Sequence, residues 1–250
     1  MNCHYGSRFI NDDGTWKDMT KMKITTTDLS PTAAQMPRIM GLGMASKLFR
    51  ENEDLSEFTT LSNNGNEIVF GTIGDSSTSE GIFWEAINAM GVIQIPVVMS
   101  VWDDGHGISV PVEMQTTKGS ISKALQGFKK EENTNGIEII VVNGWDYPAL
   151  CAAYHKAANL AREKHIPVLV HVKELTQPQG HSTSGSHERY KSKKRLAWEK
   201  EYDCVIQFRK WILDNNWATQ NELEAIHLEC KKAVRDAKNL AWKAYITCLL

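Results

Sequence analysis

Residues 67–109 read EIVFGTIGDSSTSEGIFWEAINAMGVIQIPVVMSVWDDGHGIS, and this stretch decides the fold class. Two apolar runs, residues 67–73 and 95–102, are rich in valine and isoleucine and are bounded by turn residues. Such runs predict strands that are buried on both faces. Since a helical pattern separates them, the strands are expected to lie parallel in one sheet.

The connection between these two strands has its own signals. A loop is expected over residues 74–78 and a helix over about 79–90, because Ser77 and Glu80 have the spacing of a capping box. A helix that begins just after a glycine-containing loop places backbone N–H groups where they can receive an anion.

The rest of the chain continues the alternation of helices and strands. The other expected elements are a helix over 33–50, a strand over 138–142, a helix over 148–164, a strand over 166–174 and amphipathic helices over 195–215 and 221–249. This order predicts an α/β fold, a parallel sheet with helices on both faces, followed by a C-terminal helical extension. The polar loop over 176–190 is long for a connection, as loops with a function often are.

The expected organisation has three parts. They are a polar, turn-rich lead-in over 1–30 that resembles the interior of a longer domain, an α/β domain over 31–190, and helices over 191–250 that pack on this domain or on a partner.

Composition narrows the classes of function. The 250 residues are 42% hydrophobic and 23% charged, as in ordinary globular proteins, and carry a formal net charge of -2. This charge favours neither nucleic acid nor an anionic membrane as a partner, and no apolar run approaches the ~18 residues of a membrane span. The five cysteines are far apart, which argues against disulfides and structural zinc and indicates a reducing compartment, the cytoplasm.

Polar loops follow two strands at the edge where a parallel sheet binds its ligands. Asp75 comes directly after the first strand, and Asp103 and Asp104 come after the second. A carboxylate beside a phosphate is repelled unless a cation lies between them, and neighbouring strand ends are about 5 Å apart. Asp75 and one of the other two aspartates are therefore candidates to share a divalent metal ion. The alternative is that both loops are ordinary polar turns.

The combination of the two loops is more specific than either loop alone. Gly74-Asp75 is followed by Asp103-Asp104, with Asp104 lying 29 positions after Asp75. This arrangement resembles the thiamine-diphosphate motif, in which Gly-Asp-Gly or Gly-Glu-Gly precedes Asn-Asn by some thirty residues. Residues 74–109 are similar to the alpha subunits of 2-oxoacid dehydrogenase E1 components, whose loops read like GEGAASEG and NNGYAIS.

Two further motifs extend the resemblance over roughly residues 29–250. Residues 29–38, LSPTAAQMPR, are similar to the family's Ser-Pro-Leu-x-x-Gln stretch, and residues 181–184, HSTS, with Arg189-Tyr190 are similar to its His-Ser-(Thr/Met)-Ser loop. The variant at residues 102–105, WDDG, particularly resembles bacterial enzymes in which alpha and beta halves are fused.

The resemblance implies thiamine diphosphate and Mg²⁺ as cofactors and assigns a role to each matching residue. The implied roles are magnesium binding for Asp75, Asp104 and the backbone carbonyl of His106, diphosphate binding for Gly74, Ser76 and Ser77, other cofactor contacts for Ile108, Ser30 and Thr32, and support of lipoyl acylation for His181, which also reaches toward the cofactor.

The implied activity is oxidative decarboxylation of a 2-oxoacid, with transfer of the acyl group to lipoyl on the E2 component. The implied partners are an E1 beta subunit or fused beta half, which supplies a catalytic glutamate, and the lipoyl domain of E2, in an α2β2 assembly or a homodimer of fused chains. Without its beta half the chain is expected to be inactive. A transketolase-like enzyme, which should lack the HSTS loop, and an inert fragment or assembly module are the alternatives.

The chain also departs from the family pattern. Asp103-Asp104 replaces Asn-Asn, Trp102 stands where some members carry an arginine, and the family's upstream arginine segment is absent. Three features have plainer readings: His171 is expected in the core, residues 191–195 are expected to be a solvated basic run, and the C-terminal tryptophans are expected to pack in a core or a subunit interface.

Overall fold

A computed structural model describes residues 6–27, 29–181 and 186–248 of the chain. Its centre is a four-stranded sheet in the order β1-β2-β6-β5, and every neighbouring pair is parallel. The strands are β1 (Val69–Gly74), β2 (Val97–Trp102), β5 (Glu138–Asn143) and β6 (Val168–Lys173), and a small antiparallel hairpin is formed by β3 (His106–Gly107) and β4 (Val110–Pro111).

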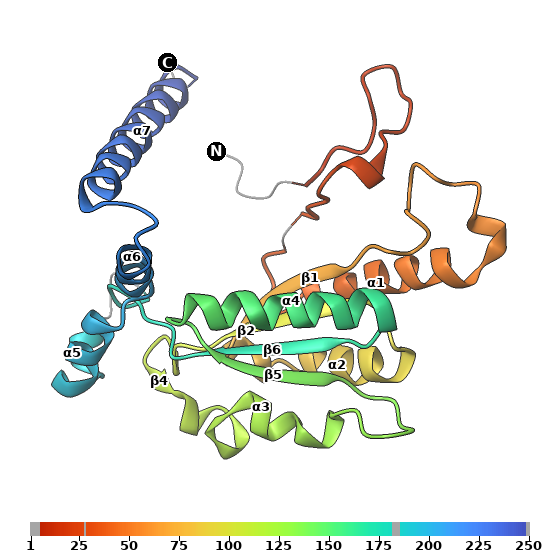
Figure 1. The fold of residues 1–250 in the computed structure, drawn as a ribbon, viewed down its shortest axis with the longest axis horizontal. Helices are drawn as coiled ribbons and strands as arrows, with labels where there is room; N and C mark the ends of the chain where they lie inside the picture. Colours follow the sequence, from red (N-terminus) through yellow and green to blue (C-terminus); the bar gives the residue numbers. More distant parts are fainter. Residues whose placement is uncertain (1–5, 28, 182–185, 249–250) are drawn as a thin grey trace.

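Seven α-helices lie in the described part of the chain (Figure 1). They are α1 (Gln35–Glu51), α2 (Gly81–Ile93), α3 (Ile121–Ala124), α4 (Tyr147–Lys164), α5 (Lys193–Glu201), α6 (Cys204–Asp214) and α7 (Gln220–Thr247). None of these helices combines the length and the apolar character needed to cross a membrane.

The sheet is covered on both faces, as the apolar strands predict. Along β2, Val97, Met99 and Val101 pack with residues of α1, α2 and α3, whereas Val98 packs with the buried alanines of α4. Small side chains on α4 (Ala153, Ala157 and Ala161) let this helix lie close to the strands. The predicted α/β class and parallel sheet are confirmed.

Helix α2 begins later than the sequence predicts, and the predicted capping box is wrong. The N-cap is Glu80, whose side chain makes no capping hydrogen bond. Residues Ser76–Ser79 instead form a 3-10 turn, in which the backbone N–H and the hydroxyl of Thr78 both donate to the carbonyl of Asp75. Ser77, the expected N-cap residue, lies inside this turn, and Glu80 takes the N-cap position instead.

The predicted single helix over 195–215 is also wrong, because the chain forms two helices there. Helix α5 ends at Glu201 and α6 begins at Cys204. The carboxylate of Asp203 accepts hydrogen bonds from the N–H groups of Val205 and Ile206 at 3.0 and 3.1 Å, which caps the new helix. Helix α7 follows and projects away from the sheet (Figure 1).

Candidate functional site

The carboxyl ends of β1, β2 and β6 form one continuous edge. Gly74 is in register with Trp102, and Trp102 with Val172. The backbone pairing continues past the strands, since the N–H of Asp75 donates to Trp102 at 3.0 Å and that of Asp103 donates to Val172 at 2.9 Å. The two predicted loops therefore start side by side.

An open groove of about 280 Å³ lies at this edge, beside β1 and β2. Four of the residues predicted to bind the cofactor line it, namely Ser30, Thr32, Gly74 and Ser77. They come from two segments more than forty positions apart, the stretch before α1 and the loop after β1. Trp102 also lines the groove, and its ring N–H donates to the hydroxyl of Ser100 at 2.9 Å.

Asp75 is the least satisfied carboxylate at this edge. The residue is only 5% exposed, and its Oδ2 atom has no hydrogen-bond partner in the described part of the chain. Burial, followed by the nearby negative charges of Asp103 and Asp104, raises the pKa of Asp75 to about 7. A buried carboxylate in this state is stabilised by a proton or a cation.

Asp103 and Asp104 have different environments. The carboxylate of Asp103 accepts from the N–H of Gly105 at 2.8 Å and lies 2.7 Å from Nε2 of His171. Burial acts to raise the pKa of Asp103, but the hydrogen bond and charge of His171 outweigh it and leave the pKa below its ordinary value. Asp104 is only half-buried, and its carboxylate accepts from the N–H of His106 at 3.2 Å.

Asp103, His171 and Ser122 form a row whose residue types match a hydrolase triad. Nδ1 of His171 lies 2.8 Å from the hydroxyl of Ser122. However, His171 is 0% exposed and Ser122 is 4% exposed, so no substrate can reach this serine. The row is therefore structural: it holds the end of β2 against β6 and α3. The prediction that His171 lies in the core is confirmed, but its partners could not be identified from the sequence.

The loop after β2 packs directly on the loop after β1. A β-carbon placed on Gly107 would lie only 2.7 Å from Cβ of Ser76, so the glycine is required for this contact. Ile108, which follows, has φ of 57°, a conformation that a β-branched residue rarely adopts, and its side chain is exposed. Strained backbone of this kind is enriched at functional sites.

The polar loop over 176–190 returns to this edge at its end. The ring of Tyr190 packs against the ring of His106, with centroids 5.5 Å apart. His181 is exposed and makes no hydrogen bond or ring contact with Asp75, Asp104 or His106 in the described chain. The serines and threonine of the HSTS motif, residues 182–184, lie outside the described residues. The structure thus brings Asp75, Asp104 and His106 together but leaves His181 unplaced with respect to them.

Four charged side chains hold the base of this loop and were missed from the sequence. Lys191 and Glu199 are both buried, with Nζ 2.9 and 3.0 Å from the two carboxylate oxygens. Arg195 donates from Nε to Glu199 at 2.8 Å and from NH1 to Glu174 at 2.7 Å. Since Glu174 precedes the loop and Lys191 follows it, this loop-base cluster joins the two loop ends. The expectation that residues 191–195 are simply a solvated basic run is wrong for Lys191.

The carboxylate oxygens near Asp75 suit a hard cation such as Mg²⁺, which would take only some of its ligands from the protein. Within the described ranges, no three His, Cys, Asp or Glu side chains are grouped so as to hold a metal ion by themselves. Mg²⁺ takes few carboxylates and completes its shell with phosphate oxygens, carbonyls and water. The unpartnered Oδ2 of Asp75 and the nearby charge of Asp104 meet that requirement.

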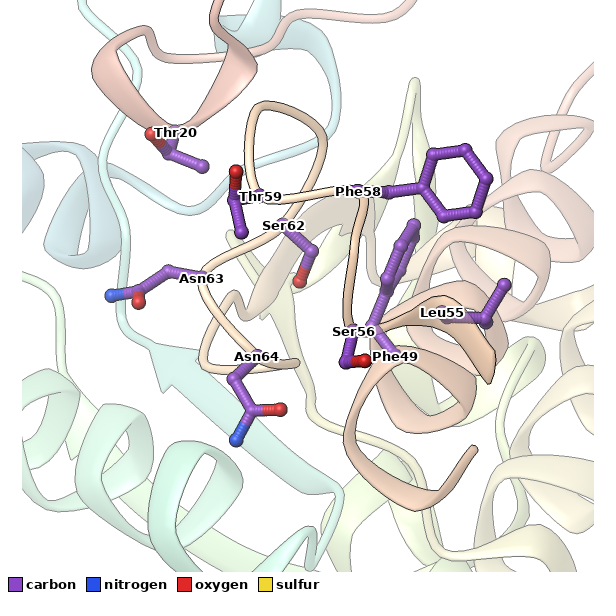
Figure 2. Close-up of a pocket in the computed structure, with 9 residues that line it drawn as sticks. All are labelled: Thr20, Phe49, Leu55, Ser56, Phe58, Thr59, Ser62, Asn63 and Asn64. Carbon is purple, nitrogen blue, oxygen red and sulfur yellow. The ribbon is translucent and has the colours of Figure 1, made fainter. Parts of the chain in front are cut away.

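A larger cavity, of about 400 Å³, lies elsewhere, between the segment after α1 and the N-terminal segment. Figure 2 shows Phe49 and Phe58 on one side of it and Thr20 and Asn63 on the other. No acid, base, histidine or cysteine lines it. This cavity lacks the groups that proton transfer or metal binding needs, so size alone does not identify the site.

Comparison with known proteins defines the class. A family model described as "Dehydrogenase E1 component" matches residues 3–247, nearly the whole chain. This chain therefore belongs to the dehydrogenase E1 component family.

Individual relatives are more distant. The chain is 28% identical over 245 residues to 2-oxoisovalerate dehydrogenase subunit alpha 1, mitochondrial, of Arabidopsis thaliana, covering 97% of this chain and 44% of that protein. It is 28% identical over 204 residues to pyruvate dehydrogenase E1 component subunit alpha of Rickettsia bellii, covering 82% and 56%. The mouse 2-oxoisovalerate dehydrogenase subunit alpha, mitochondrial, is 26% identical over 244 residues, covering 95% and 50%. The chain thus spans about half the length of these relatives.

Proposed function

We propose that this chain forms the thiamine-diphosphate-binding alpha part of a 2-oxoacid dehydrogenase E1 component, with Mg²⁺ held at Asp75. The observation that carries the proposal is the buried, unpartnered carboxylate of Asp75 beside a groove at the strand ends. Family membership supports the class of cofactor. When bound, thiamine diphosphate supplies the carbanion and the electron sink for decarboxylation of a 2-oxoacid.

Each loop has a separate task in this proposal. Asp75 and Asp104 provide carboxylate oxygens for the cation, and His106 provides its backbone carbonyl. Asp103, already paired with His171, does not bind the ion but fixes the strand end from which Asp104 projects. Because the cation neutralises the carboxylates, an anionic diphosphate can approach an edge that is otherwise acidic.

The groove holds the rest of the cofactor. Gly74, Ser76 and Ser77 offer backbone atoms to the diphosphate, and Ser30 and Thr32 face the same groove from the segment before α1, where the aminopyrimidine is expected. Exposed Ile108 supports the cofactor from the second loop. His181 assists acyl transfer to lipoyl. The beta subunit, or a fused beta half, completes the site opposite this chain, and the lipoyl domain of E2 receives the acyl group.

Calorimetric titration with thiamine diphosphate and Mg²⁺, in the presence of a separately supplied beta domain, tests the cofactor site. Asp75→Asn is expected to weaken Mg²⁺-dependent binding at least about tenfold, because it removes the charge of the buried, unpartnered carboxylate on which the site rests. Asp104→Asn is the matched control: it restores the amide of the related motif, keeps an oxygen ligand, and should retain binding. Unchanged affinity of the Asp75→Asn variant would remove this residue from the site. No binding by the unmodified pair of domains would favour an inert fragment.

The division of the site between chains has separate tests. His181→Ala in the complete enzyme should slow transfer to a lipoyl substrate while cofactor affinity is retained. Equal transfer rates would show that this histidine has no role in the step. The purified 250-residue chain should release no carbon dioxide from 2-oxoacids by itself. Sustained release would contradict a site shared with a beta domain.

A further inference from the structure

The cavity beside the N-terminal segment is lined entirely by uncharged side chains. It measures about 400 Å³, within the size range of sites that take a small molecule. The 3-10 turn Met19–Lys21 contributes Thr20, and the end of α1 with the loop after it contributes the rest. The N–H of Met19 donates to the carbonyl of Thr60 at 2.7 Å, which joins the two segments. Since no acid, base or histidine lines the cavity, it is suited to binding rather than to catalysis.

The lining is divided into an apolar and a polar side. The rings of Phe49 and Phe58 lie on one side in Figure 2, and Thr20, Thr59 and Asn63 lie on the other. Phe58 is 43% exposed, so its ring is open to a molecule that enters the cavity. A ligand that fits this lining therefore has one apolar face and one polar edge.

Four polar side chains of the lining are available to a ligand. Those of Ser56, Thr59, Asn63 and Asn64 make no hydrogen bond with any other residue in the described ranges. All four residues are exposed, so a ligand can reach them without any part of the loop unfolding. Each asparagine amide offers both N–H donors and an acceptor oxygen, and each hydroxyl can do either.

The loop that carries the two asparagines is restrained by its own contacts. The carboxylate of Glu67 accepts from the N–H of Asn63 at 2.5 Å and from the hydroxyl of Ser62 at 2.6 Å. Gly65 has φ of 66°, and a β-carbon on it would lie 2.7 Å from the backbone nitrogen of Arg50. These contacts restrict the conformations of the loop, so a ligand has less disorder to remove when it binds.

The chemistry of the lining selects among ligand classes. Phosphates, carboxylates and ammonium groups are bound most strongly by charged partners, and this cavity has none. A wholly apolar molecule would leave the amides of Asn63 and Asn64 facing it without partners. A neutral sugar satisfies both sides, because its C–H face can cover an aromatic ring while its hydroxyl groups form hydrogen bonds with the amides.

We propose that this cavity binds a neutral sugar, with a C–H face of the sugar ring against Phe58 and hydroxyl groups hydrogen-bonded to Asn63 and Asn64. No residue assigned to the metal ion or to the cofactor lines the cavity. The inference is therefore independent of the proposed function.

Saturation-transfer difference NMR of the full chain with D-glucose, D-galactose and D-mannose tests the site. At least one of these sugars should receive saturation at its C–H protons, and titration of that sugar gives its dissociation constant. Phe58→Ala and Asn63→Ala should each raise this constant at least about tenfold, since one removes the apolar wall and the other removes an amide. Phe70→Ala and Asn239→Ala are the matched controls. Both residues are exposed and neither lines the cavity, so neither change should alter the constant.

Phenol serves as a flat aromatic probe of the same cavity. It should bind more weakly than the sugar, because it leaves most of the amide and hydroxyl groups without partners. Circular dichroism of each variant confirms that the fold is retained. The proposal is overturned if none of the three sugars receives saturation, if either cavity variant leaves the constant unchanged, if the controls lose binding equally, or if phenol binds more tightly.

Discussion

Replacing Lys191 with methionine is the sharpest test of what holds the polar loop in place. The ammonium group lies 2.9 and 3.0 Å from the two carboxylate oxygens of Glu199, and the two side chains are only 3% and 4% exposed. Methionine keeps the length and the apolar stem of the lysine but removes its charge. The substitution therefore leaves a buried carboxylate with one of its two cationic partners missing.

The expected cost follows from burial. Breaking a buried ion pair by removing one partner costs about 3–5 kcal/mol, because the other charge stays out of water. Arg195 still donates to Glu199 at 2.8 Å, so we expect the lower end, about 3 kcal/mol. Lys156→Met is the control: its Nζ lies 3.4 Å from Glu138 and its side chain is 61% exposed. That change should cost less than about 1 kcal/mol.

The same pair predicts a dependence of stability on pH. Burial acts to raise the pKa of Glu199, but the hydrogen bonds and charges of Arg195 and Lys191 outweigh it and hold the pKa below its ordinary value of 4.5. The carboxylate therefore contributes stability above pH 4.5, and this contribution is lost as the pH falls below that value through the lower folded-state pKa. In Lys191→Met the loss should be smaller and should be complete at a higher pH, because one of the two cations that lower the folded-state pKa of Glu199 is gone.

Urea unfolding at neutral pH and at a series of pH values below 5, followed by tryptophan fluorescence and far-ultraviolet circular dichroism, measures both effects. Trp198 lies in α5 under the guanidinium of Arg195, 4.5 Å from its ring centroid, and reports locally. If Lys191→Met costs no more than Lys156→Met, the loop-base cluster does not stabilise the fold and the reasoning from burial is refuted.

Two other changes probe the strand-end edge. His171→Leu should cost about 2–4 kcal/mol in urea unfolding, since it leaves the buried carboxylate of Asp103 without its histidine partner. Ser122→Ala should cost only about 1 kcal/mol, and equal costs would contradict the contact assigned to Asp103 and His171. Gly107→Ala should destabilise the fold by about 1–3 kcal/mol and so lower the melting temperature, because its β-carbon would lie 2.7 Å from Cβ of Ser76. Gly81→Ala, with no atom within 4 Å of the added carbon, should leave it unchanged or raised.

Much of the fold could be predicted because its signals are local. Apolar runs predicted the four strands of the main sheet, and helical patterns predicted the helices between them; β5 begins at the predicted Glu138. The order of the strands has no local signal: β6 lies between β2 and β5 because of long-range pairing. The break between α5 and α6 was missed because helical periodicity continues through Asp203, whose capping role depends on the backbone around it.

The candidate site was also predicted only in part, because some of its residues have local sequence signals and others depend on long-range contacts. Asp75 was predicted from its place directly after a strand, and Asp104 was chosen over Asp103 by the resemblance to the thiamine-diphosphate motif; the structure brings both to one edge. The partner of Asp103 could not be predicted, since His171 is 68 positions away and reads as part of an apolar strand. The loop-base cluster was hidden for a related reason: its lysine sits in a basic run, and only packing shows that this one member is buried.

The contact between Gly107 and Ser76 has a consequence for ligand capture. Because Gly107 has no β-carbon, the backbone of the loop after β2 packs directly against Ser76 of the loop after β1, and each loop restricts the conformations open to the other. Loops that are ordered in advance lose little conformational freedom on binding, and more of the interaction energy then appears as affinity. A single small residue thus reduces the entropic cost of gathering an anion between two separate turns of the chain.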